Sequence, residues 1–301
     1  MQLKVSRNLV LFLFALGVLA GCTDLGVLVD RDDYISYPRD IHAAWSPDGK
    51  WIVYRHEDYT KYDSTYPNGL YLIDPAGNNR RLLLEGEGVL PAWSPNGQWI
   101  AYTDGVLFVM NVRLKETRPL TDFLTFFPTW SPDGMKLAFD TPFQDPRGAN
   151  VIWIINADGT GLRDISQHGV GEWRMPAWSP NGSIILHTRY LTGVLGQEIY
   201  LMDTSGQAPV RLTYNGSDDR YPKWSADGSM IAWTMLPPRG TFEVWIMKND
   251  GTQQKKLTNG THPSFSPDSR TIVFSDFNLA KNKIVLWRID VDGRNLKQLT
   301  H

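Results

Sequence analysis

The chain has 301 residues, of which 42% are hydrophobic and 21% charged, and its formal net charge is −2. This length allows an ample core. The near-neutral charge leaves no clustered basic face of the kind that nucleic-acid binding requires, so no nucleic-acid partner is expected.

The N-terminal residues 1–22 have the pattern of a targeting segment. Lys4 and Arg7 precede an apolar run from Leu9 to Leu19 that is too short for a comfortable membrane span. The run ends in Leu19-Ala20-Gly21-Cys22, which resembles a bacterial lipobox, and Cys22 is the only cysteine of the chain. The resemblance implies a signal peptide, acylation of Cys22 and a lipid anchor in an envelope membrane, the outer one if the host has two. An uncleaved N-terminal helix or a simple secretory signal are the alternatives.

Residues 23–41 are expected to form a short tether, in which residues 26–29 have the composition of a strand. After the tether, one five-residue motif recurs six times, with starts 48, 37, 48, 46 and 41 residues apart. A self-similar period of this size indicates a repeat architecture. The copies read WSPDG, WSPNG, WSPDG, WSPNG, WSADG and FSPDS, and they begin at Trp45, Trp93, Trp130, Trp178, Trp224 and Phe265.

Each copy combines a tight turn with the strands around it. In the first copy, Pro47 presets φ, Asp48 can accept hydrogen bonds from nearby backbone, and Gly49 tolerates a positive φ. A nearly continuous apolar strand follows, then a third strand, a second tight turn and a short fourth strand. Residues 42–301 are therefore predicted to form an all-β, six-bladed β-propeller with four antiparallel strands per blade.

The copies resemble the PD40, or WD40-like, repeat of the TolB β-propeller family, whose pattern runs from P-x-W-S-P-D-G to a closing L-T. The resemblance covers residues 42–301 and implies the propeller fold. Only residues 23–41 separate the expected cleavage site from the first repeat. That is too little for the α/β domain that precedes the propeller in TolB.

The variable connections predict where ligands bind. The second-to-third-strand loops differ between copies and should lie at one end, beside the entrances of the inner strands, whereas the tight turns lie at the other end. Seven charged or titratable residues are expected at this channel mouth, where they would bind an anionic group, a metal or a peptide tail: Asp40, His42, Glu172, Arg174, Asp219, Arg220 and His262. Alternatively they are solvated loop charges that pair with one another, and their spacing is a poor metal signature, so no metal site is assigned.

Aromatic residues of the loops are the expected partner contacts, namely Tyr59, Tyr62, Tyr66, Phe143 and Trp173. The tryptophans of the motif and His187 are expected in the core.

The predicted function is that of a protein-interaction scaffold that catalyses no reaction. It is expected to be anchored to a membrane of the cell envelope, outside the cytoplasm. No G-x-S-x-G nucleophile motif occurs, and no catalytic residue or cofactor is assigned. The expected partners are envelope proteins or peptide segments, and the protein is expected to be monomeric. The alternatives are a glycan-active enzyme that uses Asp40, Glu172 and Asp219, and a propeller that binds a metal or small ligand.

Overall fold

The computed structural model describes residues 37–58, 66–142, 150–166, 171–190 and 196–301. The chain divides into two units, Met1–Ile35 and Ser36–His301, and the described residues all belong to the second. Cys22, Tyr59, Tyr62 and Phe143 lie outside these ranges. Within them, no helix is long and apolar enough to cross a membrane.

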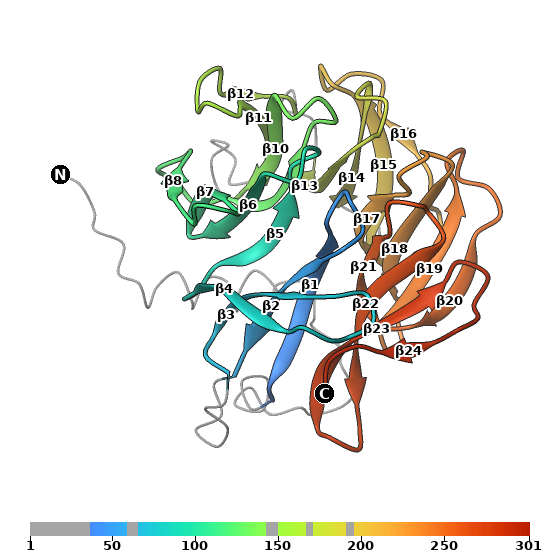
Figure 1. Ribbon diagram of the computed structural model, residues 1–301. Helices are drawn as coiled ribbons and strands as arrows, with labels where there is room; N and C mark the ends of the chain where they lie inside the picture. The colour runs from blue at the N-terminus through green and yellow to red at the C-terminus, as the bar shows by residue number, and fades with distance from the viewer. Residues whose placement is uncertain (1–36, 59–65, 143–149, 167–170, 191–195) are drawn as a thin grey trace. The chain divides into compact units, whose positions relative to one another are not determined.

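The described residues of the second unit form 24 β-strands, and each sequence repeat supplies four of them in order (Figure 1). The first two repeats contribute β1 (Arg39–Trp45), β2 (Ile52–Glu57), β3 (Gly69–Ile73), β4 (Arg81–Glu85), β5 (Val89–Trp93), β6 (Trp99–Asp104), β7 (Val106–Asn111) and β8 (Thr117–Pro119). The third and fourth contribute β9 (Phe126–Trp130), β10 (Lys136–Thr141), β11 (Val151–Asn156), β12 (Arg163–Asp164), β13 (Glu172–Trp178), β14 (Ile184–Tyr190), β15 (Gln197–Asp203) and β16 (Val210–Arg211). The last two contribute β17 (Asp218–Trp224), β18 (Met230–Leu236), β19 (Glu243–Lys248), β20 (Lys255–Asn259), β21 (Thr261–Phe265), β22 (Thr271–Asn278), β23 (Lys283–Asp290) and β24 (Lys297–Gln298).

The expectation of six blades is wrong, although the all-β propeller class is confirmed. Four sheets, those of the second to fifth repeats, stand as separate four-stranded blades. The first and last repeats instead share one eight-stranded sheet, because β1 pairs in parallel with β23 through Arg39 and Ile284. The backbone amide of Ile284 donates a 3.1 Å hydrogen bond to the carbonyl of Pro38. The propeller therefore has four separate blades and one double-width sheet.

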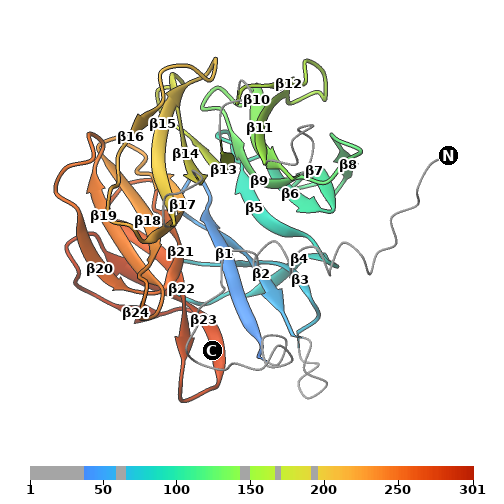
Figure 2. The ribbon, with the colours of Figure 1, turned by 180° about the vertical axis from the view of Figure 1, so that it is seen from behind.

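The first strands of successive repeats line the middle of this arrangement. Each of β1, β5, β9, β13, β17 and β21 contacts the next one, and β21 contacts β1, so the cycle is closed. The two opposite views show the later strands of each repeat farther out, with β20 and β24 near the outside (Figures 1 and 2). Because β1 starts at Arg39, the propeller begins three residues before the expected boundary at 42.

The repeated turns form as their residues predict. In the first copy the Asp48 carboxylate accepts hydrogen bonds from the Ser46 hydroxyl at 2.7 Å and from the Lys50 amide at 3.1 Å. The Gly49 amide bonds to the Ser46 carbonyl at 3.0 Å, and Gly49 has a φ of 70°. This left-handed conformation is the one that glycine adopts without cost, so the sequence motif marks a structural turn in each repeat.

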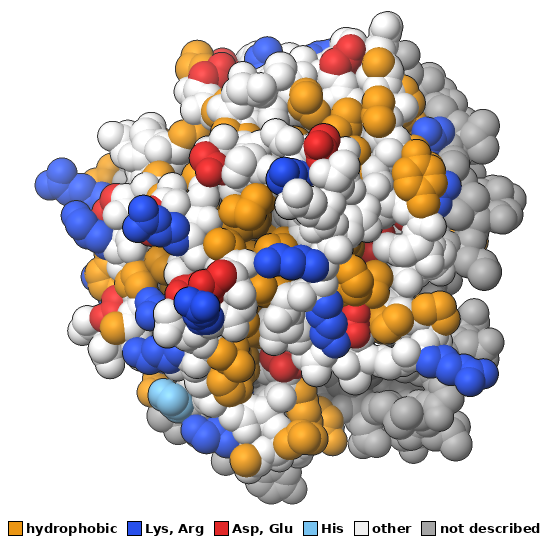
Figure 3. Space-filling model, turned by 90° about the vertical axis from the view of Figure 1, so that its right-hand side faces the viewer, with side chains coloured by type: hydrophobic (Ala, Val, Ile, Leu, Met, Phe, Trp, Pro, Cys, Tyr) orange, Lys and Arg blue, Asp and Glu red, His pale blue; other side chains and the backbone are white. Residues whose placement is uncertain are grey.

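The core lies between neighbouring sheets. The second strand of the first repeat is buried on both faces along its whole length, as its unbroken apolar pattern predicts. The motif tryptophans are partly buried and pack against the core clusters, which confirms their structural role. Outside, Lys and Arg side chains are spread over the face that carries the outer strands β20 and β24 (Figure 3). Lys255 and Lys256 are exposed on β20, where charge opposes edge-to-edge pairing.

Candidate binding site at the mouth end

The predicted working surface corresponds to one end of the propeller, which we call the mouth end. There the inner strands begin and the second strands end. Arg39 at the start of β1 pairs with Glu57 at the end of β2, and Asp218 at the start of β17 pairs with Leu236 at the end of β18. The tight Ser-Pro-Asp-Gly turns join the other ends of these strands. The second strands therefore end beside the inner-strand entrances, as expected.

Six inner-strand residues, which we call the axial ring, have an unusual backbone conformation. Each is the third residue before the motif aromatic, and each has a φ between 51° and 57° although none is glycine. Such a left-handed conformation costs a non-glycine residue about 1–2 kcal/mol. It coincides with a bulge in the pairing of the first and second strands. The axial ring consists of His42, Leu90, Phe127, Met175, Tyr221 and His262.

Side chains of the axial ring converge on the middle of the propeller. The ring of His262 lies 4.3 Å from that of His42 and 4.1 Å from that of Tyr221, measured between centroids. Phe127 approaches Tyr221 to 5.7 Å. Because β13 lies between their strands β9 and β17 in the cycle, this last contact must reach across the interior. The bulges therefore turn aromatic side chains inward.

The two histidines of the axial ring are neutral and have buried ring nitrogens without hydrogen-bond partners. Burial first, and then the nearby cations Lys223, Arg39 and Arg220, lower the pKa of His262 to about 3. The pKa of His42 is also well below its usual value, first through burial and then through His262 and surrounding cations. Nδ1 of His42 and both ring nitrogens of His262 are buried without a partner. Each neutral imidazole therefore has an N–H donor to offer.

A lysine that the sequence analysis did not single out lies beside this pair. Burial lowers the pKa of Lys223 to about 8. Its ammonium group forms no hydrogen bond or ion pair with any other described residue, whereas the neighbouring Arg220 on the same strand pairs with Asp218. Lys223 is detectable in the sequence only by comparing the repeats, because the residue before the motif aromatic is Ala, Thr or Ser in the other copies.

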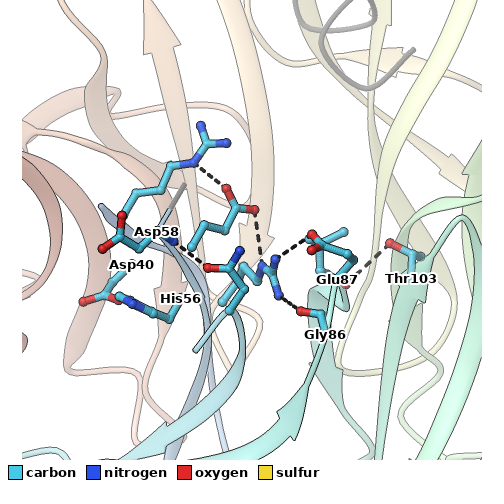
Figure 4. A network of polar contacts seen from close by, with 11 residues as sticks. Asp40, His56, Asp58, Gly86, Glu87 and Thr103 are labelled. Carbon is cyan, nitrogen blue, oxygen red and sulfur yellow. Dashed lines mark hydrogen bonds and ion pairs between the residues drawn. The ribbon is translucent and has the colours of Figure 1, made fainter. Parts of the chain in front are cut away.

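A buried ion-pair network links the first two repeats at the mouth end (Figure 4). The guanidinium of Arg55, which is 0% exposed, bonds to Glu57 at 3.3 Å, to Glu87 at 3.0 Å and to the carbonyl of Gly86. Glu57 also accepts a 2.5 Å bond from Arg39. The four charges thus alternate in sign from β1 to the second repeat, which satisfies the buried guanidinium.

Asp40 and Tyr66 lie on the other side of the same network. Nδ1 of His56 is 2.7 Å from the Asp40 carboxylate, and Arg80 approaches that carboxylate to 3.7 Å. The Arg80 guanidinium stacks over the Tyr66 ring at 3.8 Å. Tyr66 is 42% exposed. Of the predicted partner contacts in the described ranges, it is therefore the one available at the surface.

The other predicted residues have their own local partners. Glu172 accepts a 2.8 Å bond from Asn150, and Asp219 accepts bonds from the Trp233 indole at 2.9 Å and from Asn215 at 3.0 Å. Asp40, Glu172 and Asp219 are thus each hydrogen-bonded to a different neighbour. No group of three or more His, Cys, Asp or Glu side chains within the described ranges stands ready to hold a metal ion.

Two predicted residues of the fourth repeat face inward. Trp173 is only 3% exposed and stacks on His187, with ring centroids 4.6 Å apart, so it is part of the core and not a partner contact. The expected core position of His187 is confirmed. Arg174 has a buried Nε without a partner and lies near Asp140. Burial raises the pKa of Asp140 to about 7, while Arg174 and the Met175 amide oppose the shift.

Comparison with known proteins identifies the repeat. The family model described as the TolB beta propeller domain, PD40, matches residues 55–301. The chain belongs to this family. The expected resemblance to TolB-type propellers is thus confirmed at the level of the family.

Individual relatives match over shorter stretches. A protein TolB homolog of Chlorobium luteolum is 31% identical over 103 residues, which is 33% of this chain and 22% of that protein. An uncharacterized peptidase, YuxL of Bacillus subtilis, is 29% identical over 156 residues, 49% of this chain and 21% of that protein. The matches thus span about a fifth of the length of these curated relatives.

Among solved structures, TolB from Acinetobacter baumannii superposes with a TM-score of 0.68 at 21% identity. The superposition covers 87% of this chain and 63% of that one. At this identity the likeness concerns the fold alone.

Proposed function

We propose that this PD40 propeller is a non-catalytic binding module of the cell envelope, and that it takes a segment of another envelope protein at its mouth end. One observation carries the proposal: the chemistry that differs between repeats is gathered at the mouth end. The Arg39–Glu57–Arg55–Glu87 network belongs to the first two repeats alone, whereas the opposite end repeats one turn. Variable residues on a rigid scaffold are typical of recognition surfaces.

The matched relatives carry names of both kinds, a TolB homolog and an uncharacterized peptidase, and each match spans about a fifth of the relative. The proposal of a binding role therefore rests on the family and on the mouth end, and not on these two names. The candidate carboxylates Asp40, Glu172 and Asp219 are each hydrogen-bonded to a neighbour of their own.

Membrane attachment is part of the same proposal and rests on the lipobox-like sequence around Cys22. Acylation there would hold the mature protein at an envelope membrane, because each buried CH₂ of the acyl chains contributes about 0.8 kcal/mol. A Cys22→Ala variant of the full chain should lose incorporation of labelled palmitate and leave the membrane fraction. Label retained by this variant would contradict the anchor and leave the binding proposal intact.

Site-specific photocrosslinking tests the binding surface. A benzoylphenylalanine is placed at Tyr66, at the mouth end, or at Met135, which is 65% exposed beside a tight turn at the opposite end. In cells that produce the full chain, the Tyr66 position should give a discrete adduct with an envelope protein, and the Met135 position should not. Equal adducts from both positions, or adducts from Met135 alone, would refute the mouth end as the binding surface.

A further inference from the structure

The middle of the propeller holds an uncompensated set of hydrogen-bond donors and cations. Nδ1 of His42, both ring nitrogens of His262 and the Lys223 ammonium have no partner among the described residues. Buried polar groups without partners are rare in native proteins, since each costs about 1–3 kcal/mol. Such a group therefore points to something absent from the chain itself.

The charged side chains that shift the pKa of the two histidines are cations. The positive charges of Arg39 and Lys223 lower the pKa of both histidines, and that of Arg220 lowers the pKa of His262. Arg39 and Arg220 are themselves paired with Glu57 and Asp218, whereas Lys223 is not paired with any described residue. A neutral imidazole N–H and a lysine ammonium are donors to an anion.

Apolar groups surround these donors. Phe127 and Tyr221 contribute ring faces, and the sulfur of Met175 lies 3.4 Å from the Tyr221 amide. His42, Phe127, Tyr221, Lys223 and His262 are all partly exposed, so solvent reaches both the donors and the apolar groups. Ligand sites commonly combine apolar walls with a few convergent polar groups.

We propose that the axial ring binds a carboxylate carried on an apolar or aromatic group, such as the C-terminal residue of a peptide, with Lys223, His42 and His262 as its donors. This proposal rests on the proposed binding function, because it names the chemical group that enters from the mouth end. A free aromatic acid and a peptide chain end share this chemistry. Phosphate or sulfate would not use the apolar walls.

Two probes that differ only in charge test the site. Acetyl-Leu-Phe with a free carboxylate and the same dipeptide as its C-terminal amide are titrated into the purified full chain by calorimetry, with benzoate as a third ligand. The free acid should bind about tenfold or more tighter than the amide, because a hydrogen bond to a charged group is lost in the amide. Benzoate competing as well as the dipeptide assigns the site to free aromatic acids, and weaker competition assigns it to chain ends.

Substitution of the lysine localises the effect. Lys223→Met should weaken binding of the free acid about tenfold or more and leave the amide unchanged, whereas Lys223→Arg should restore binding. Lys255→Met on the exposed outer strand β20 is the matched control and should bind as the unmodified chain does. Equal binding of acid and amide, an unaffected Lys223→Met, or binding of neither probe at about 10 mM would overturn the proposal.

The pH dependence of the unmodified chain gives a test without any variant. The titratable and charged groups at the site come from five strands: His42 and Arg39 from β1, Arg55 from β2, Arg174 from β13, His262 from β21, and Asp218, Arg220 and Tyr221 from β17, the strand of Lys223. The pKa values of both histidines are lowered, so these rings stay neutral above pH 6, and burial raises the pKa of Tyr221. Lys223 loses its proton near pH 8. Affinity for the free acid should therefore fall between pH 6.5 and 9.5, and a flat profile would count against the site.

These outcomes are separable from those of the proposed function. An adduct at Tyr66 together with equal acid and amide binding would leave the mouth end as a docking surface and reject the carboxylate site alone. Acid-selective binding without an adduct would support the site and reject an envelope protein as its source.

Discussion

Removal of the buried guanidinium of Arg55 should destabilise the propeller. Its three groups of contacts, to Glu57, Glu87 and the Gly86 carbonyl, lie where the first repeat meets the second. Arg55→Met retains most of the buried aliphatic length and removes the charge. The variant therefore tests the electrostatic part of the contact between the two repeats, with little loss of packing.

The size of the effect follows from what remains. Breaking a buried ion pair from one side costs about 3–5 kcal/mol when the other charge stays buried and alone. Here Glu57 keeps its 2.5 Å bond to Arg39, and the Glu87 side chain is 40% exposed and regains water. Only the Gly86 carbonyl loses a partner outright, at about 1–3 kcal/mol. We therefore expect the free energy of unfolding to fall by about 2–4 kcal/mol.

Denaturant unfolding followed by tryptophan fluorescence measures this loss. The midpoint should move to lower denaturant concentration at an unchanged slope. Arg294→Met is the matched control, because the Arg294 side chain is 83% exposed and only 3.8 Å from its partner Asp292, and it should change stability by less than about 0.5 kcal/mol. If Arg55→Met were as stable as this control, the network would contribute nothing and the reasoning from burial would fail.

Two further predictions concern single positions. A Cβ on Gly206, which has a φ of 84°, would lie 1.6 Å from the Ile165 carbonyl oxygen, whereas a Cβ on Gly216, at 68°, would meet nothing within 4 Å. Thermal unfolding should therefore show Gly206→Ala losing about 3 kcal/mol or more and Gly216→Ala only about 1 kcal/mol; similar losses would contradict the clash. Burial raises the pKa of Asp219 to about 7 in the folded protein, whereas an aspartate of the unfolded chain has a pKa of about 3.9. Between these values the folded state keeps a proton that the unfolded state releases. Asp219 therefore makes the free energy of unfolding fall as the pH rises from about 4 to 7. Asp219→Asn should remove that fall, so that between pH 4 and 7.5 its free energy of unfolding gains on the order of 2–4 kcal/mol relative to that of the unmodified chain. If the free energies of unfolding of the two proteins changed in parallel with pH, this prediction would be refuted.

Much of the fold is predictable because each repeat encodes its own turns and strands. Gly49 and Asp48 fix a turn through local hydrogen bonds, and the apolar run after it fixes a strand buried on both faces. The joining of the first and last repeats was not predictable in this way. It depends on a pairing between Arg39 and Ile284, which are distant in sequence and carry no motif.

The site was predicted in outline and missed in detail. The sequence placed His42 and His262 at one end, and the structure brings their rings to 4.3 Å. The sequence also suggested Trp173 as a surface contact, but its side chain is buried in the core. Arg55 and Lys223 were not singled out, because each is conspicuous only when compared with the same position of the other repeats. Their partners come from neighbouring repeats or from outside the chain, which local patterns do not encode.

The axial ring separates what the fold requires from what recognition requires. All of its members share one left-handed backbone conformation, and Leu90 and Met175 adopt it as His42 and His262 do. A strain of about 1–2 kcal/mol per residue that occurs in every repeat belongs to the architecture and is no sign of function. What the architecture leaves open is the side chain that each bulge turns inward. Three neighbouring bulges carry His42, His262 and Tyr221, and Lys223 lies beside them. The bulge conformation does not require these particular side chains. The identity of these side chains, and not the strain they share, is therefore what a binding experiment should vary.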